Sequence, residues 1–169
     1  MSLYLKRKDF FKFKLVIEDE NGVEKYHIIK RKGLFNPNYD IFDTNENLLA
    51  TVNSFRKTIQ IGNGQAIKLK YRFSLSGLKR DILPLGWQLK SSFWYNNFAV
   101  TDEEKNPIIQ MKRTVFSFKD EYKIDFLDPK NEICSIAMAL FSLIEVEYIA
   151  MMTSIVSLVS LVILLKYIG

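Results

Sequence analysis

Apolar and polar residues alternate along most of the chain, which is typical of strands that bury one face. The stretches Phe11–Ile17 and Ile67–Phe73 show this pattern. Turn signals separate the stretches, notably Asn21-Gly22 and Gly62-Asn-Gly64. Further short strands are expected at residues 23–30, 39–42, 48–52, 87–90, 93–100, 107–111 and 122–126. Short strands separated by frequent turns predict an antiparallel barrel or sandwich and not parallel βαβ units.

One strand–turn–strand unit recurs along the chain. The stretch Asn38–Leu49 returns as Asn97–Ile108, with Tyr39 matching Phe98 and Asp43 matching Asp102. A looser copy covers residues 15–22. Each copy is a strand that ends in Asp, a polar turn and a returning strand. Repetition of one hairpin unit is a way for an antiparallel sheet to close and remove its edges, so the repeat favours a barrel.

The C-terminal part holds two apolar segments, separated by Glu145 and Glu147. The first, Ile133–Ile144, is too short to cross a bilayer and is typical of a buried core helix. Asp128 and Pro129 before it are a helix-start signal. A helix that is apolar on every side must be surrounded by protein. We therefore predict a central helix over residues 129–144 inside a barrel domain formed by residues 1–145.

The second apolar segment, Tyr148–Ile168, carries Lys166 as its one charged residue. About twenty apolar residues match the hydrocarbon thickness of a bilayer, and Lys166 and Tyr167 lie where interfacial residues are expected. We predict a single-pass C-terminal transmembrane helix over 148–168. Because the N-terminus lacks an apolar signal-peptide core, the barrel is expected in the cytoplasm. The alternative is that this segment fills the protein core and never meets lipid.

Few residues offer catalytic or metal-binding chemistry. His27 is the single histidine and Cys134 the single cysteine, so histidine clusters and multi-cysteine zinc sites are excluded within one chain. The stretch Asp43–Asn47 opens like a calcium loop but has Leu48 and Ser54 where that loop needs glycine and glutamate. We expect a hairpin turn there, Cys134 in the core, no cofactor, no metal and no enzymatic activity.

The chain has a net charge of +5, and its basic residues form clusters at 6–8, 30–32 and 68–72. Lys68, Lys70 and Arg72 alternate with apolar residues and fall on one face of a strand. These three form our candidate site for anionic lipid headgroups, and the alternative is an ordinary solvated outer face. No nucleic-acid recognition motif accompanies the clusters, so membrane lipid is the expected partner and nucleic acid is not. The sequence defines no protein partner.

Together, the repeated unit and the run Phe116–Asp128 leading into an apolar helix resemble the tubby C-terminal-like superfamily. The resemblance is to its LURP-one-related and phospholipid-scramblase-like branch and covers about residues 9–145. It implies a mainly β fold, a closed antiparallel barrel of about twelve strands around a C-terminal hydrophobic helix, with residues 148–168 as an addition. Superfamily relatives bind phosphoinositides or are tied to lipid scrambling, but a fold does not transfer activity.

The resulting expectation is a membrane-anchored binding or scaffold module that contacts anionic phospholipids. A scramblase-like lipid-moving protein and a soluble barrel whose tail is buried in its core are the alternatives.

Overall fold

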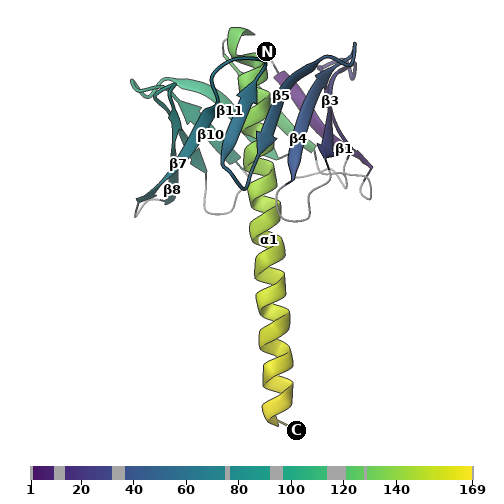
Figure 1. Ribbon diagram of the computed structural model, residues 1–169, viewed down its shortest axis with the longest axis vertical. Coiled ribbons are helices and arrows are strands. Elements are labelled where there is room, and N and C mark those ends of the chain that lie inside the picture. Colours follow the sequence, from purple (N-terminus) through teal and green to yellow (C-terminus); the bar gives the residue numbers. More distant parts are fainter. Residues whose placement is uncertain are drawn as a thin grey trace.

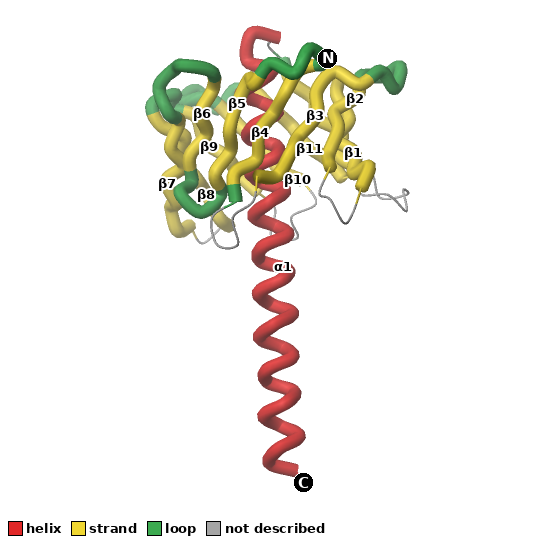
Figure 2. The backbone as a smooth tube through the Cα atoms, turned by 45° about the vertical axis from the view of Figure 1, so that its right-hand side comes forward, coloured by secondary structure: helices red, strands yellow, loops and turns green. Residues whose placement is uncertain are grey.

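A computed structural model describes residues 2–9, 14–31, 37–74, 77–91, 97–113, 121–127 and 129–168. For residues 9, 72–74, 77–78, 91, 146, 149–151, 159 and 161–168 it describes the backbone alone. Twelve strands form a barrel around one long helix, which runs through the interior of the barrel and extends beyond one end (Figures 1 and 2).

The strands follow one another along the chain with short connections. They are β1 (Ser2–Asp9), β2 (Lys14–Glu18), β3 (Glu24–Arg31), β4 (Asn38–Asp43), β5 (Leu48–Asn53), β6 (Thr58–Ile61), β7 (Ile67–Ser74), β8 (Gly77–Leu83), β9 (Trp87–Ser91), β10 (Asn97–Thr101), β11 (Pro107–Arg113) and β12 (Glu121–Phe126). A 3₁₀ turn, η1 (Pro129–Asn131), leads into helix α1 (Glu132–Ile168).

Every strand pairs antiparallel with its neighbours in sequence, and β1 closes the sheet by pairing with β12. Leu5 lies opposite Tyr122 at this seam, and Ser2 lies opposite Asp125. Closure leaves no unpaired strand edge, which protects the sheet from pairing with other chains. The predicted closed antiparallel barrel is therefore confirmed.

Several strands differ from those that the sequence pattern predicted. The first strand, β1, was not expected because the Lys6-Arg7-Lys8 run interrupts its alternation. The short β6 and the polar β8 were also missed. The predicted strand over Phe11–Ile17 is seen as β2 from Lys14, and Phe11 and Phe13 lie outside the described residues.

Alternate residues of the strands point into the barrel and pack around the first part of α1. Ile17, Ile41 and Val100 are fully buried on the sheet side, as are Ile136 and Phe141 on the helix side. The helix buries residues on all its faces here, from Cys134 to Ile144. The predicted hydrophobic helix at the centre of the barrel is confirmed, because only such a helix fills a lumen lined by aliphatic side chains on all sides.

Helix α1 runs without interruption over 37 residues, whereas the sequence predicted two helices parted by Glu145 and Glu147. Both glutamates have positively charged partners at the barrel wall, so neither ends the helix. The helix begins at Glu132, after η1, and not at Pro129; Asp128 lies outside the described residues. Two charges in an apolar helix were thus an unreliable boundary signal.

The strand order gives the barrel two distinct ends. Because β1 starts at the end where α1 begins, odd strands run away from that end and even strands run toward it. We call that end the start rim, which carries the turns after β2, β4, β6, β8 and β10. The opposite end, where α1 leaves the barrel, is the exit rim (Figure 1).

Beyond the exit rim the helix projects away from the sheet (Figure 2). Every residue from Met152 to Leu158 is exposed, so all sides of the helix face outward. The lumen is occupied by residues 134–144, and the alternative in which this later segment fills the core is wrong. Over the described residues, α1 lacks a stretch both long enough and apolar enough to cross a membrane, and the predicted single-pass anchor is not supported.

Candidate functional site

The predicted headgroup residues lie at alternate positions along β7, with Lys68 next to the beginning of the strand at the start rim and Arg72 nearer its end at the exit rim. Lys68 and Lys70 are exposed on the outer face, while Ile67 and Leu69 alternate with them and are buried in the lumen. No ion pair joins Lys68 or Lys70 to a carboxylate among the described residues. Arg72 occupies the next alternate backbone position, and its side chain lies outside the described part of the structure.

The register adds two further lysines to this face. Lys79 on β8 lies directly opposite Arg72, and Lys90 on β9 lies directly opposite Lys79. Like charges at directly opposed positions of a sheet destabilise it. A bound anion would reduce this repulsion. Sequence reasoning missed Lys79 and Lys90, because only the strand register brings them beside β7.

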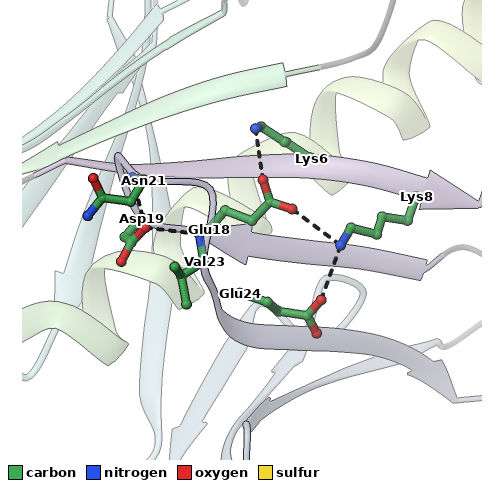
Figure 3. A network of polar contacts seen from close by, with 7 residues as sticks. All are labelled: Lys6, Lys8, Glu18, Asp19, Asn21, Val23 and Glu24. Atoms are coloured by element: carbon green, nitrogen blue, oxygen red, sulfur yellow. Dashed lines mark hydrogen bonds and ion pairs between the residues drawn. The ribbon is translucent and has the colours of Figure 1, made fainter.

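The basic cluster at residues 6–8 is neutralised by carboxylates of the same barrel. Lys6 donates to Glu18 at 2.8 Å, and Lys8 lies between Glu18 and Glu24 at 3.2 and 3.3 Å (Figure 3). The hydrogen bond from Lys6 lowers the pKa of the Glu18 carboxyl and raises the pKa of the Lys6 ammonium. This cluster joins β1, β2 and β3 and is a structural feature of the barrel wall.

Two ion pairs connect α1 to the wall near the exit rim. Glu147 pairs with Arg7 of β1, and Glu145 lies 2.5 Å from the guanidinium of Arg80 on β8. Arg80 is 1% exposed, and its guanidinium also lies 5.2 Å from the ring centre of Tyr71. Such a buried positive charge requires a nearby negative one, and Glu145 supplies it.

Glu145 experiences opposing influences in this position. Burial raises the pKa of its carboxyl to about 8, and the charge of Lys57 works against that rise. The Arg80 guanidinium is a permanent positive charge and also favours the ionised carboxylate. The contact therefore weakens when Glu145 takes up a proton.

The other end of the core helix is fixed by a different contact. The hydroxyl of Tyr26 on β3 donates to the carboxylate of Glu132, the first residue of α1, at 2.9 Å. Burial and this hydrogen bond raise the pKa of Tyr26. Together with the two ion pairs near the exit rim, this contact sets the depth of the helix in the barrel.

The repeated unit of the sequence forms one kind of turn at the start rim. The carboxylates of Asp19, Asp43 and Asp102 each accept hydrogen bonds from the backbone of their own turn. Three residues after each aspartate the backbone has positive φ, at Gly22, Glu46 and Lys105. The hydrogen bond from the Asn47 side chain lowers the pKa of Asp43, and that from Asn106 does the same for Asp102.

These contacts explain why the calcium-like opening at Asp43 forms a turn. Both carboxylate oxygens of Asp43 accept hydrogen bonds from within the turn, from the backbone of Asn45 and Asn47 and from the Asn47 amide. No group of three or more possible metal ligands occurs in the described ranges.

The lone histidine and the lone cysteine both have structural surroundings. His27 stacks on Phe42 with ring centres 5.4 Å apart, and its Nε2 atom lies 3.3 Å from Glu46. Cys134 lies inside the barrel, where burial raises the pKa of its thiol to about 12. A thiol with so high a pKa stays protonated and is a poor nucleophile.

Comparisons with known proteins agree with this architecture. The family model described as LURP-one-related matches residues 1–145. The fold is similar to an X-ray structure of a protein from Arabidopsis thaliana, with a TM-score of 0.61 and 17% sequence identity. The similarity covers 86% of this chain and 90% of the plant protein. No curated protein matches the chain.

Proposed function

The chain belongs to the LURP-one-related family, and we propose that it is a non-catalytic binding or scaffold module that attaches to anionic membranes. In this proposal the free end of α1 enters the membrane and the basic face of β7 contacts lipid headgroups. The barrel then lies on the cytoplasmic side.

The observation that carries the proposal is the exposure of an apolar helix on all of its sides. Tyr148, Ile155, Val156 and Leu158 are among the most exposed large apolar side chains of the chain. An isolated helix of this kind is not stable in water, because packing of an apolar face supplies most helical stability. A partner protein with one groove would cover only a stripe of it, whereas lipid surrounds a helix on every side.

The hydrogen bonds of the polar side chains in the projecting part of α1 also support a lipid environment. The hydroxyl of Ser157 donates to the carbonyl of Thr153, and the hydroxyl of Ser160 donates to the carbonyl of Val156, both at 2.9 Å. Groups satisfied within their own helix need no water or partner protein. The same bonds argue against the scramblase-like alternative, which requires polar groups available to passing headgroups.

The β7 face supplies the headgroup contact in this proposal. Lys68 and Lys70 are exposed cations that form no described ion pair; the register places Asp81 opposite Lys70 and adds Lys79 and Lys90 to the same face. A cation close to an anionic leaflet contributes about 1 kcal/mol of binding free energy. Several cations together therefore produce a marked preference for anionic over neutral lipid.

To test the headgroup contact, we would measure vesicle binding of a chain ending after Glu147, which retains the contacts of both glutamates with the barrel wall. Vesicles with and without phosphatidylserine are compared. We expect binding that depends on the anionic lipid. The triple change K68Q, K70Q and R72Q removes about 3 kcal/mol, or more than a hundredfold in affinity.

The matched control is the triple change K25Q, K105Q and K130Q, which removes the same charge from positions at or next to the start rim. We expect it to retain most of the binding. Equal and weak binding to both kinds of vesicle would refute the headgroup contact, and so would equal losses in the two triple variants.

A further inference from the structure

Among the described residues, the two ends of the barrel differ in the sign of their predominant charge. Acidic side chains gather at the turns of the start rim and outnumber the one lysine there, Lys105: they are Asp19, Glu20, Asp43, Glu46, Asp102, Glu103 and Glu104. In the described ranges, basic side chains gather at the strand ends and the turn of the exit rim: Lys14, Lys30, Arg31, Arg56, Lys57, Lys90, Lys112 and Arg113. Arg31 is paired there with Asp40, and Glu121 begins β12 at the same rim. The charge of the described residues is therefore unevenly distributed along the barrel axis.

The exit-rim cations surround the point where α1 leaves the barrel. Lys14 begins β2, Lys30 lies near the end of β3, and Lys112 lies near the end of β11 on another side of the barrel. Lys14, Arg56 and Lys112 are exposed, and no described carboxylate forms an ion pair with them. Sequence order hides this ring, because its members come from strands far apart in the chain.

The turn between β5 and β6 adds an apolar contact to this rim. Phe55 is 70% exposed there and is followed directly by Arg56 and Lys57. An exposed aromatic ring beside cations suits the headgroup region, where the ring reaches apolar depth and the cations meet phosphates. Apolar side chains such as Leu48 and Leu85 are exposed at the start rim too, so the sign of the charge is what distinguishes the two ends.

We infer that the exit rim is the surface with which the barrel docks end-on onto an anionic leaflet, through Lys14, Arg56, Lys112 and Phe55. The inference rests on the proposed membrane attachment and adds its orientation: the barrel axis stands upright on the membrane. The acidic start rim faces away from the leaflet, and like-charge repulsion keeps it there. The exit rim surrounds the point where α1 leaves the barrel, so the rim and the apolar end of the helix can meet the same membrane (Figure 1).

The test uses the full chain with a fluorophore at one rim or the other. Phe55→Cys places bimane on the exit rim, and Thr44→Cys places it in an exposed turn of the start rim. The natural thiol of Cys134 is buried with a raised pKa and does not compete for the label. Quenching by lipids with a nitroxide on the headgroup is measured in vesicles with and without phosphatidylserine, after co-flotation establishes attachment.

We expect strong quenching of the label at position 55 and little quenching of the label at position 44. In neutral vesicles the difference in quenching between the two positions should be smaller. Each removed cation weakens the contact roughly fivefold. The triple change K14Q, R56Q and K112Q therefore moves the label at position 55 out of the quencher's range. The triple change K25Q, K105Q and K130Q removes the same charge from positions at or next to the start rim and leaves the quenching unchanged.

The possible results separate the inference from the proposal beneath it. Protein that co-floats but shows equal quenching at positions 55 and 44 overturns the end-on orientation and leaves membrane attachment standing. Equal effects of the two triple variants also overturn the role of the exit-rim cations. Protein that does not co-float with either kind of vesicle overturns the proposed function, and the orientation falls with it.

Discussion

Arg80 and Glu145 place two charges inside a barrel whose described core consists mainly of aliphatic and aromatic side chains. Removing one member of a buried ion pair leaves the other charge buried without an opposite charge. This lowers the free energy of unfolding more than replacing both residues with apolar ones. This asymmetry makes the pair a sensitive probe of how the helix is held in the barrel.

We expect Arg80→Met to lower the free energy of unfolding by about 3–5 kcal/mol at pH 9 and by less at pH 6. A carboxyl whose folded pKa is raised stabilises the fold less as pH increases from its unfolded to its folded pKa, because the folded state must then either keep a proton that the unfolded state releases or bury a charge. Without Arg80 the pKa of Glu145 rises further, so the loss is largest at high pH. Urea unfolding at the two pH values measures it.

The double variant R80M/E145L is the control, since it replaces both charges with apolar side chains. We expect it to recover most of the lost stability and to lose the dependence on pH between 6 and 9. If Arg80→Met were equally destabilised at both pH values, the ionisation of Glu145 would not depend on Arg80.

Asp43 provides a second prediction at the scale of one residue. Its pKa is lowered by hydrogen bonds of the turn, so its contribution is complete above the unfolded value of about 3.9. That contribution is lost as pH falls through the lower folded value. We expect Asp43→Ala to reduce stability at pH 7 and to make unfolding below pH 4 less dependent on pH.

Thermal unfolding between pH 2 and pH 7 measures this change, with Thr44→Ala in the same turn as control. The Thr44 side chain is exposed, and that variant should behave like the natural protein. If Asp43→Ala and Thr44→Ala had the same acid dependence, the hydrogen bonds of the turn would not account for the lowered pKa.

At the scale of elements, α1 combines two environments in one continuous helix. Phe141 is fully buried in the lumen, whereas Leu158 is 66% exposed beyond the exit rim. We expect Phe141→Ala to cost about 3–5 kcal/mol through lost burial and the remaining cavity. Leu158→Ala should change barrel stability by less than about 0.5 kcal/mol.

Denaturant unfolding followed by tryptophan fluorescence compares the two variants, since both remove apolar volume from the same helix. Equal losses of stability would mean that the projecting segment packs against the barrel in solution.

The sequence predicted the parts of this fold that depend on local pattern. Alternation over Ile67–Phe73 predicted β7, and the repeated Asp turn at Asp43 and Asp102 predicted two hairpins of the same kind. The uniform apolar character of residues 133–144 predicted the central helix, because no other element needs burial on every side.

Features that depend on strand register or on closure of the barrel could not be predicted from the local sequence pattern. The pairing of β1 with β12 joins the two ends of the barrel domain, and nothing in the charged stretch Lys6-Arg7-Lys8 indicates it. The same limit applies to the candidate site. The placement of Lys68 and Lys70 followed from alternation. The position of Lys79 opposite Arg72 depends on the register of β7 and β8, and the exit-rim cations meet only after the sheet has closed.

For the whole molecule, the barrel and the projecting helix form one body with an apolar end and a basic rim around it. Residues 134–144 of α1 occupy the lumen, and the last part of the helix lies outside the barrel. Its exposed apolar residues and internally bonded serines are compatible with lipid. The central claim is that this segment attaches the barrel to a membrane.

The most direct measurement of that claim is cell fractionation with a carbonate wash, applied to the full chain and to a chain ending after Glu147. Carbonate removes proteins held by charge and retains proteins held by apolar insertion. We predict that the full chain stays in the membrane pellet while the shorter chain is released. Release of the full chain by carbonate would contradict the account.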